Sequence, residues 1–390
     1  MRTARVSARG ADRWRRRQHP WIYRSDLLEA PAGEAGAVGV IGARGEWVGM
    51  ALWSPHSQIA LRLLTSEERA IDGGFFEERI AAAWGYRREL GPAGTAYRVI
   101  HGEADGLPSL IADWYHGHLV VQLLSAGLEA YRGEIVAALR AVTDPVGILA
   151  RNDVTVRDHE RLPRAVELLY GEVPEWVEVL EGEIRYLAAP WTGQKTGAFL
   201  DQRENRVRVG ELAFGRALDC FAYHGSFALH VARGATQVTA VDSSAEALAR
   251  AAVNIELNPG LAERGGIEFV EANAFDFLRA QQAAGAAYDT IVLDPPAFAK
   301  RRDALERALR GYKEINLRAL KLLAPGGLLC TFSCSFHVRP ELFREMLESA
   351  AADAGRAVRW REWRGQALDH PEILQIPESA YLKGAILQVV

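Results

Sequence analysis

Apolar and polar positions change their periodicity twice along the chain, and each change marks a predicted domain boundary. Residues 1–70 alternate in short runs broken by regularly placed glycines, which predicts a small β-barrel or sandwich. Residues 74–186 mix helical and strand-like stretches and predict an α+β middle domain. From 190 to 390 strands and helices alternate, which is typical of a doubly wound, Rossmann-like parallel sheet. The sequence therefore predicts three domains, the last of them α/β.

Individual elements follow from the same patterns. In the first two regions we expect helices over 75–90 and 131–141 and strands over 38–42, 46–54, 58–65, 107–113, 118–124 and 177–187. In the third region we expect helices over 227–233 and 303–323 and strands over 216–221, 237–242, 267–270, 288–294 and 327–335. Ser243 and Glu246 have the spacing of a capping box, and Asn273 can cap the next helix.

Polar residues stand at the carboxyl ends of the predicted parallel strands, which is where open α/β sheets bind ligands. The residues at these positions are Asp219, Asp242, Asn273, Asp294 and Cys334. A helix cap explains each acid by itself equally well, above all Asp242. Because all of them fall at one predicted edge, the series favours a ligand site over separate caps.

The turn after the first of these strands, residues 219–227, has fewer glycines than a dinucleotide fingerprint. S-adenosylmethionine has no pyrophosphate, so a single glycine, Gly225, gives its methionine portion enough room. A carboxylate at Asp242 can accept hydrogen bonds from ribose hydroxyls, and Asn273 can contact the adenine edge. The pattern thus predicts an S-adenosylmethionine site. Besides the strand-end residues it includes Phe221, Tyr223, Gly225, Ser226, Phe227, Ser243, Ala274 and Phe275.

The segment 294–300, Asp-Pro-Pro-Ala-Phe-Ala-Lys, is the most specific short motif in the chain. Its prolines stiffen the turn and remove backbone donors that would compete for the Asp294 carboxylate. Phe298 offers a ring on which a base can stack, although a buried phenylalanine in a rigid turn is the alternative. We expect Asp294 and Pro295 to contact the cofactor, and Pro296, Phe298 and Lys300 to contact the substrate.

Charge is distributed unevenly along the chain. The net charge of −4 gives no overall attraction to nucleic acid, but residues 1–24 hold eight arginines and one acid, Asp12. This patch predicts phosphate binding, with Arg13, Arg16 and Arg17 as the candidates. The alternative is a solvated tail, because arginine outnumbers lysine 41 to 5 over the whole sequence.

The three cysteines form neither a disulfide framework nor a metal-binding pattern, so we expect no metal and a reducing, cytoplasmic location. No apolar run is long enough to span a membrane, and no secretory signal is evident.

Strand alternation turns Cys220 away from the ligand edge, and Cys330 lies in mid-strand. Cys334 stands at a strand end beside Asp294 and is the candidate nucleophile, with Asp294 as the group that holds the substrate base.

Several segments resemble the bacterial 23S ribosomal RNA (cytosine-5-)-methyltransferases that carry an N-terminal PUA RNA-binding domain. These segments are 19–23, 101–108, 195–203, 294–300, 333–335 and 381–384. The resemblance implies a PUA domain at 1–70, a middle domain at 74–186 and a class I methyltransferase domain at 190–390. It also implies cofactor contacts at Phe199, Asp201, Gln202 and Arg203. The chain departs from the family at His224 and Ser226, where threonine and glycine are usual, and at Asn273, where an acid is usual.

The resemblance further implies an activity, which is the formation of 5-methylcytosine in 23S ribosomal RNA through a covalent adduct of Cys334. The partner would be this RNA or an assembling large subunit, and a homodimer is plausible for the family. Two alternatives stay open. One is a methyltransferase that modifies an exocyclic base amine and needs no cysteine. The other is a non-catalytic RNA-binding factor in ribosome assembly that keeps only the fold.

Overall fold

The computed structural model describes residues 1–262, 266–299 and 301–390, and these residues form two compact units. The first unit contains Met1–Val179, Leu187–Leu200 and Leu368–Ser379. The second unit contains Leu180–Tyr186, Asp201–Ala367 and Ala380–Val390. The chain therefore crosses between the units several times. The predicted division into three domains stays a prediction, because the first unit contains both of the first two regions.

The N-terminal part of the first unit is a six-stranded sheet in the order β2-β6-β5-β4-β1-β3. Its elements are β1 (Thr3–Val6), α1 (Ala8–Arg15), β2 (Trp21–Tyr23), β3 (Leu27–Glu29), β4 (Gly36–Ile41), β5 (Trp47–Trp53) and β6 (Ile59–Thr65). The antiparallel strands β4, β5 and β6 confirm the three predicted strands. The alternative of a solvated N-terminal tail is wrong, because β1 pairs with β4 and the Ser7 hydroxyl caps α1.

The second part of this unit is a five-stranded sheet in the order β11-β10-β9-β8-β7. Its elements are α2 (Gly73–Leu90), β7 (Ala96–His101), β8 (Leu110–Tyr115), β9 (His118–Leu123), α3 (Ala126–Glu129), α4 (Arg132–Thr143), β10 (Gly147–Arg151) and β11 (Val166–Gly171). Phe75, Phe76 and Ile135 of the helices belong to its core, which Leu52 and Leu64 of the first sheet also join. The α+β prediction is confirmed, and the shared apolar core explains why both sheets form one unit.

Several element boundaries differ from the prediction in this part of the chain. The strands β7, β10 and β11 were not expected, and β8 begins at Leu110 rather than at residue 107. The single strand expected over 177–187 is two strands, β12 (Val177–Glu181) and β13 (Ile184–Ala188). Gly182, with a φ of 58°, makes the turn between them. The apolar alternation continues through this turn, so periodicity alone did not show the reversal.

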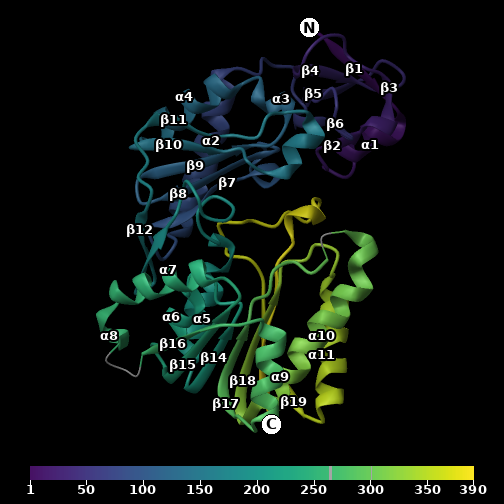
Figure 1. Cartoon of the computed structure of the whole chain (residues 1–390). Helices are drawn as coiled ribbons and strands as arrows, with labels where there is room; N and C mark the ends of the chain where they lie inside the picture. The colour runs from purple at the N-terminus through teal and green to yellow at the C-terminus, as the bar shows by residue number, and fades with distance from the viewer. Residues whose placement is uncertain (263–265, 300) are drawn as a thin grey trace. The chain divides into compact units, whose positions relative to one another are not determined.

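The second unit contains a seven-stranded sheet in the order β16-β15-β14-β17-β18-β20-β19 (Figure 1). Its strands are β14 (Gly215–Cys220), β15 (Ala235–Asp242), β16 (Ile267–Glu271), β17 (Tyr288–Leu293), β18 (Leu323–Ser333), β19 (Val358–Arg364) and β20 (Lys383–Val389). The first five strands of the order are parallel, whereas β20 runs antiparallel to β18 and to β19. The predicted doubly wound fold is confirmed, but the two antiparallel strands at its edge were not expected.

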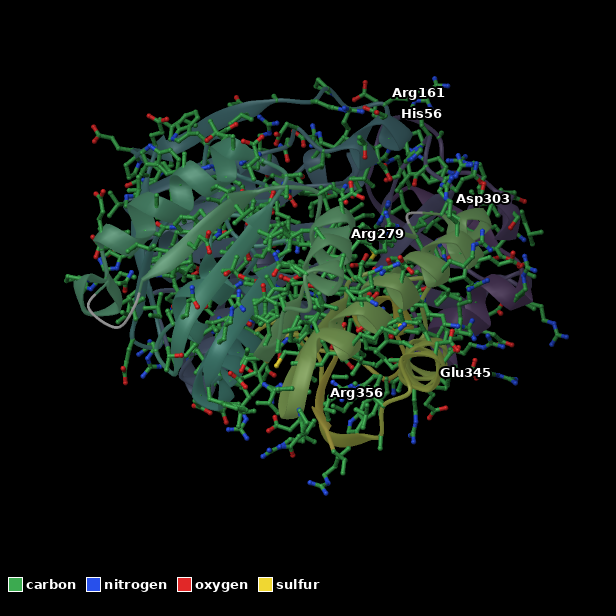
Figure 2. The ribbon with its side chains drawn as sticks, turned by 60° about the horizontal axis from the view of Figure 1, so that its bottom comes forward. His56, Arg161, Arg279, Asp303, Glu345 and Arg356 are labelled. Carbon is green, nitrogen blue, oxygen red and sulfur yellow. The ribbon has the colours of Figure 1, made fainter. Side chains whose placement is uncertain are left out.

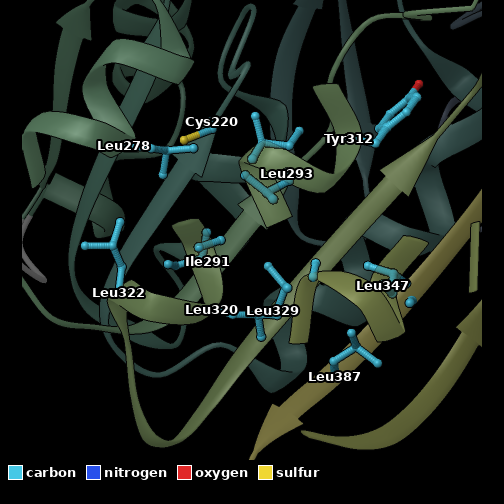
Figure 3. Close-up of a cluster of buried hydrophobic side chains, with 14 of the residues drawn as sticks. Cys220, Leu278, Ile291, Leu293, Tyr312, Leu320, Leu322, Leu329, Leu347 and Leu387 are labelled. Carbon is cyan, nitrogen blue, oxygen red and sulfur yellow. The ribbon is translucent and has the colours of Figure 1, made fainter. Parts of the chain in front are cut away.

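Helices cover this sheet on both faces (Figure 1). They are α5 (Arg203–Leu212), α6 (Ser226–Val231), α7 (Ala245–Glu256), α8 (Pro259–Ala262), α9 (Ala274–Ala283), α10 (Leu305–Leu322) and α11 (Pro340–Ala354). Leu278, Leu320 and Leu347, from α9, α10 and α11, pack against β17 and β18 in one apolar cluster (Figure 3). The described part of the chain contains no helix long and apolar enough to cross a membrane.

Two expected helix caps have different outcomes. Asn273 caps α9, as predicted, by accepting hydrogen bonds from the backbone N–H groups of Phe275 and Asp276. The capping box at Ser243 is wrong by one residue, because Ser244 caps α7 and accepts from Ala247. The Asp242 carboxylate accepts the Ser244 N–H, and this contact moves the start of the helix.

A buried arginine ties the C-terminal segment of the first unit to its second sheet. Arg87 in α2 is fully buried and forms a bidentate ion pair with Asp105. It also donates to the backbone carbonyl of Asp369 at 2.9 Å, while the Asp369 carboxylate accepts the Arg98 N–H at 2.7 Å. One cation therefore joins three segments that are distant in sequence.

Replacement of this arginine by an apolar residue should destabilise the unit strongly. Arg87→Met leaves the Asp105 carboxylate without its partner, which lowers the free energy of unfolding by about 3–5 kcal/mol. Arg88→Met, on the exposed face of the same helix, is the matched control and should change it by less than about 0.5 kcal/mol. Chemical denaturation of both variants measures the difference, and equal stabilities would contradict the assignment.

Candidate cofactor and active site

Three aspartates meet at the carboxyl edge of the parallel strands in the second unit. Asp219 is the penultimate residue of β14, Asp242 is the last residue of β15, and Asp294 directly follows β17. The order of the sheet reverses between β14 and β17, so the edge lies at a topological switch point, where open α/β sheets bind their ligands. The structure thus brings together three of the five predicted strand-end residues.

Asp219 is the most unusual of these acids. Exposed charges of this unit such as Arg279, Asp303 and Glu345 project into solvent (Figure 2). Asp219 is only 1% exposed, and neither carboxylate oxygen accepts a hydrogen bond from the described residues. Burial raises the pKa of Asp219 well above its usual range, and the negative charges of Asp294 and Asp242 raise it further, while the backbone N–H of Ala228 opposes the rise. A buried carboxyl group of this kind is suited to a cationic ligand.

The turn after β14 has a strained backbone. Phe221 and Tyr223 have φ angles of 67° and 50°, in the left-handed region that non-glycine residues rarely adopt. Gly225 has a φ of 80°, and a Cβ atom at this position would lie 2.9 Å from the Cβ of Ala251 in α7. The Asp242 carboxylate holds the turn by accepting the Tyr223 N–H at 2.8 Å. A glycine is therefore required at position 225, and contacts within the protein fix the shape of the turn.

His224, which departs from the family pattern, points into the protein. It is 4% exposed and stacks on Tyr186, with ring centroids 5.3 Å apart and planes at 25°. Burial, followed by the positive charge of Arg206, lowers the pKa of His224 to about 3. The side chain is therefore neutral at physiological pH and adds no charge to the turn. Ser226 and Phe227 begin α6, and Phe227 packs against Phe332 rather than into the turn.

The remaining predicted contacts after β15 and β16 have other roles as well. Asp242 keeps its carboxylate fixed through the N–H groups of Tyr223 and Ser244, while Ser243 is exposed. The side-chain oxygen of Asn273, expected at the adenine edge, is the cap of α9. Ala274 is buried, and the ring of Phe275 lies 5.9 Å from that of Phe298. Their contacts with the cofactor stay predictions.

A chain of hydrogen bonds orients Asp294. Gln202 donates its amide to Oδ1 of Asp294 at 2.8 Å, and Asn205 donates to the Gln202 carbonyl at 2.6 Å. Arg364 of β19 in turn donates to the Asn205 side chain at 3.0 Å. Sequence reasoning missed this chain, because Asn205 and Arg364 lie far apart in the sequence and fall in no motif. Gln202, expected as a cofactor contact, positions Asp294.

The other residues of the 199–203 segment are placed as follows. Asp201 accepts the Tyr381 hydroxyl at 2.8 Å, and Arg203 at the start of α5 is buried. Phe199 belongs to the first unit, where the Lys195 ammonium lies 4.7 Å from its ring centroid. Contacts of these residues with the cofactor also stay predictions.

Cys334 lies beside the Asp-Pro-Pro turn, as predicted. It directly follows β18, which pairs with β17, and its side chain is half-buried. The hydroxyl of Ser335 accepts the Ala299 N–H at 3.2 Å and bonds to the Tyr312 hydroxyl at 2.9 Å. These contacts fix the cysteine segment to the turn that contains Asp294. Neither Ser335 nor Tyr312 was singled out from the sequence, because both look like ordinary core residues.

The other two cysteines belong to the core. Cys220 packs beside Leu278 and Leu293 (Figure 3). Burial raises the pKa of the Cys220 thiol well above its usual range and that of Cys330 to about 12. Both thiols are therefore neutral and inaccessible, so Cys334 is the reactive candidate among the three.

The predicted substrate contacts are only partly defined. Pro295 is buried and Pro296 is exposed, while the ring of Phe298 packs 4.6 Å from that of Tyr312. Lys300 lies outside the described residues. In the first unit, Arg13 lies over the ring of Tyr23 and near Asp26, Arg16 pairs with Asp12, and Arg17 is exposed.

Comparison with known proteins gives a consistent result. The family model for S-adenosylmethionine-dependent methyltransferases matches residues 97–385, and that for a PUA-like domain matches residues 6–66. Ribosomal RNA large subunit methyltransferase I of Pseudoalteromonas atlantica is 40% identical and covers 96% of both chains. The protein of the same name from Klebsiella pneumoniae is 40% identical over 99% of this chain and 98% of its own.

Two solved structures share the fold over the full length of both chains. A protein from Streptococcus mutans, assigned as an S-adenosylmethionine-dependent methyltransferase, superposes with a TM-score of 0.83 at 21% identity. A second methyltransferase structure, in complex with SAH, superposes with a TM-score of 0.84 at 22% identity. At these identities the likeness shows the fold alone.

The sheet order and the acids at its carboxyl edge define the class, which is that of the class I methyltransferases with S-adenosylmethionine as cofactor. Within that class, the chain belongs to the family of S-adenosylmethionine-dependent methyltransferases that includes ribosomal RNA large subunit methyltransferase I. The residues fit this cofactor, because Asp219 offers buried, unpartnered acceptors to a ligand that carries an ammonium and a sulfonium group.

Removal of the Asp219 charge should stabilise the free protein and weaken cofactor binding. A raised folded-state pKa means that protonated Asp219 stabilises the fold, and that this contribution is lost as the pH rises through that pKa. At neutral pH, Asp219→Asn should therefore raise the melting temperature by several degrees without cofactor. It should also weaken S-adenosylmethionine binding about 10- to 100-fold.

Thermal unfolding and titration calorimetry measure both effects. The control is Asp353→Asn, which removes an exposed acid of α11 that pairs with Lys313 and should leave both quantities nearly unchanged. Cofactor affinity equal to that of the unmodified protein would remove Asp219 from the site.

Proposed function

We propose that this chain methylates carbon 5 of a cytosine in large-subunit ribosomal RNA, with Cys334 as the covalent nucleophile. The full-length relatives named as ribosomal RNA large subunit methyltransferases support the substrate class. The observation that carries the chemistry is the half-buried Cys334 at the end of β18, fixed through Ser335 to the turn of Asp294.

A cysteine is needed because carbon 5 of cytosine is a poor nucleophile. The Cys334 thiolate adds to carbon 6, which breaks the conjugation of the ring and gives carbon 5 enamine character. When bound, S-adenosylmethionine supplies an electrophilic methyl group. Carbon 5 takes up this methyl group and loses its proton to solvent. The bond between carbon 6 and sulfur then breaks, which restores the ring and the thiolate.

Asp294 holds the base in this scheme. Its carboxylate can accept a hydrogen bond from the exocyclic amine of cytosine, or donate to ring nitrogen 3 when it is protonated. Gln202 donates to Oδ1 and so fixes the plane of the carboxylate. The carboxylate of Asp242 at the same edge, and that of Asp219 when it is ionised, would favour the cationic methyl donor over its neutral product.

We further propose three domains, with RNA binding at 1–70, a middle domain at 74–186 and catalysis at 190–390. The PUA-like match over residues 6–66 supports the first of these. Arg16 and Arg17 directly follow α1 and are exposed, so they can contact phosphates. A base within a helix or a stacked loop has to flip out of its stack to reach Cys334.

A cytoplasmic location follows from the ribosomal RNA substrate, and the homodimer stays a prediction.

Methylation of an exocyclic amine is the second candidate, because the segment 294–298 also suits an enzyme that holds an amine. Such an enzyme transfers the methyl group directly to nitrogen and has no use for a thiolate. Variants of Cys334 therefore separate the two candidates.

Substitution of Cys334 should abolish methylation. Cys334→Ala and Cys334→Ser remove the thiolate, and both should lower the rate by at least about a thousand-fold. The control is Cys330→Ala, which changes a buried thiol of the same strand and should keep near-normal activity. The assay uses large-subunit RNA from a strain that lacks the gene and mass spectrometry of the digested nucleosides.

The product decides between the candidates. The proposal requires 5-methylcytidine with the unmodified enzyme and none with the Cys334 variants. Methylation on the exocyclic nitrogen, or full activity of Cys334→Ala, would contradict it.

A further inference from the structure

A buried lysine stands next to the proposed nucleophile. Lys383 is the first residue of β20, and its Cα lies opposite that of Ser333 at the end of β18. The residue is only 4% exposed, so its ionisable side chain is among the most buried of the unit. Lysine is rarely buried to this extent without a partner, since its ammonium group loses hydration. The position therefore calls for a compensating interaction.

The hydrogen bonds of Lys383 compensate only in part. Its Nζ donates to the backbone carbonyls of Ser335 and Tyr381, each at 2.7 Å. An ammonium group has three N–H donors, and both acceptors are neutral. Among the described residues no carboxylate forms a salt bridge with Lys383. The Lys383 ammonium group thus has no carboxylate partner among the described residues, and it binds the carbonyl of Ser335, the residue that follows Cys334.

The Cys334 side chain, as a thiolate, can supply the negative charge that the Lys383 ammonium group lacks. Burial lowers the pKa of Lys383 to about 8, and the negative charge of Cys334 is what opposes this shift. Another titratable group that interacts with Cys334 is the Tyr312 hydroxyl from α10, whose pKa is raised by burial and by the Cys334 charge, so that it stays neutral. The nearest residue on β19 is Arg364, opposite Gly384, and it is occupied with Asn205. Lys383 is therefore a cation whose charge acts on Cys334, and its Nζ is held at the carbonyl of the next residue, Ser335.

We propose that the Lys383 ammonium group stabilises Cys334 as a thiolate and so prepares it for attack. Lys383 is a positioning residue in this role, since it acts through Cys334 and neither gains nor loses a proton in the reaction. The thiol proton passes to solvent, and no bond to Lys383 forms or breaks. The same charge favours the thiolate again when the bond between carbon 6 and sulfur breaks. The catalytic part of this inference rests on the proposed function, whereas the ionisation of Cys334 can be measured without it.

The test measures the thiol directly. The full-length protein is alkylated with iodoacetamide over a range of pH, and mass spectrometry follows the peptide that contains Cys334. We expect an apparent thiol pKa below the ordinary value of about 8.5. Lys383→Gln can keep hydrogen bonds to both carbonyls but removes the charge. It should raise the apparent pKa by about one unit or more, so that alkylation at neutral pH is about tenfold slower.

Controls separate a charge effect from a loss of structure. Lys383→Arg keeps the charge and should restore much of the reactivity. Lys321→Met, on the exposed end of α10, should leave the profile unchanged. The buried Cys220 and Cys330 report on folding within the same sample, because they stay unreactive only while the fold is intact. An ordinary thiol profile in the unmodified protein, or the same profile in a folded Lys383→Gln variant, would overturn the inference.

Methylation assays keep this inference apart from the proposed function. With the proposed chemistry, Lys383→Gln should lower kcat about tenfold or more, move the pH profile upward and leave KM for RNA unchanged. Should Cys334→Ala still methylate while Lys383→Gln shifts the thiol profile, the proposed function fails and the thiolate assignment stands. Should Cys334→Ala be inactive while the thiol profile of Lys383→Gln is unchanged, the proposed function stands and the role of Lys383 fails.

Discussion

The buried carboxyl group of Asp219 is the constraint on which the proposed cofactor site depends. A carboxylate without hydrogen-bond donors is unfavourable in a protein interior, and two further acids at the same sheet edge make it more so. The fold tolerates this cost because the parallel strands are held by a large apolar cluster on α9, α10 and α11. A ligand with an ammonium and a sulfonium group relieves the cost. In the proposed site, stability of the free protein and affinity for the cofactor would thus oppose one another at a single residue.

The two antiparallel strands at the edge of the sheet, β20 and β19, contribute further residues to the proposed site. β20 returns between β18 and β19 and places Lys383 opposite the end of the strand that leads to Cys334. β19 contributes Arg364, the far end of the hydrogen-bond chain through Asn205 and Gln202 to Asp294. The parallel strands therefore supply the acids, whereas the antiparallel strands supply the groups that orient Asp294 and face Cys334. The acids proposed for the methyl donor thus lie at the ends of the parallel strands, and Lys383, the cation proposed for the thiolate, lies on the antiparallel strand β20.

Much of this arrangement could be predicted from the sequence, for identifiable reasons. The strands β14 to β18 are apolar runs that end in polar residues, so their type was readable, and with it the strand-end positions of Asp219, Asp242, Asp294 and Cys334. The Asn273 cap followed from the preference of asparagine for that position. The cap at Ser244 was missed because two adjacent serines compete, and only the contact from Asp242 decides between them. Strands β19 and β20 were missed because β20 is inserted between β18 and β19, a pairing between segments that are not adjacent in the sequence.

The sequence by itself determined the class of the protein and the identity of its chemical groups. Alternation of strands and helices is a local property, and residues at strand ends share an edge whenever the strands are parallel. The tertiary structure alone decided the state of those groups. Whether Asp219 is paired, whether His224 points inward and whether a cation faces Cys334 depend on burial and on neighbours from distant segments. Solvation and long-range charge set pKa values, and neither can be read along the chain.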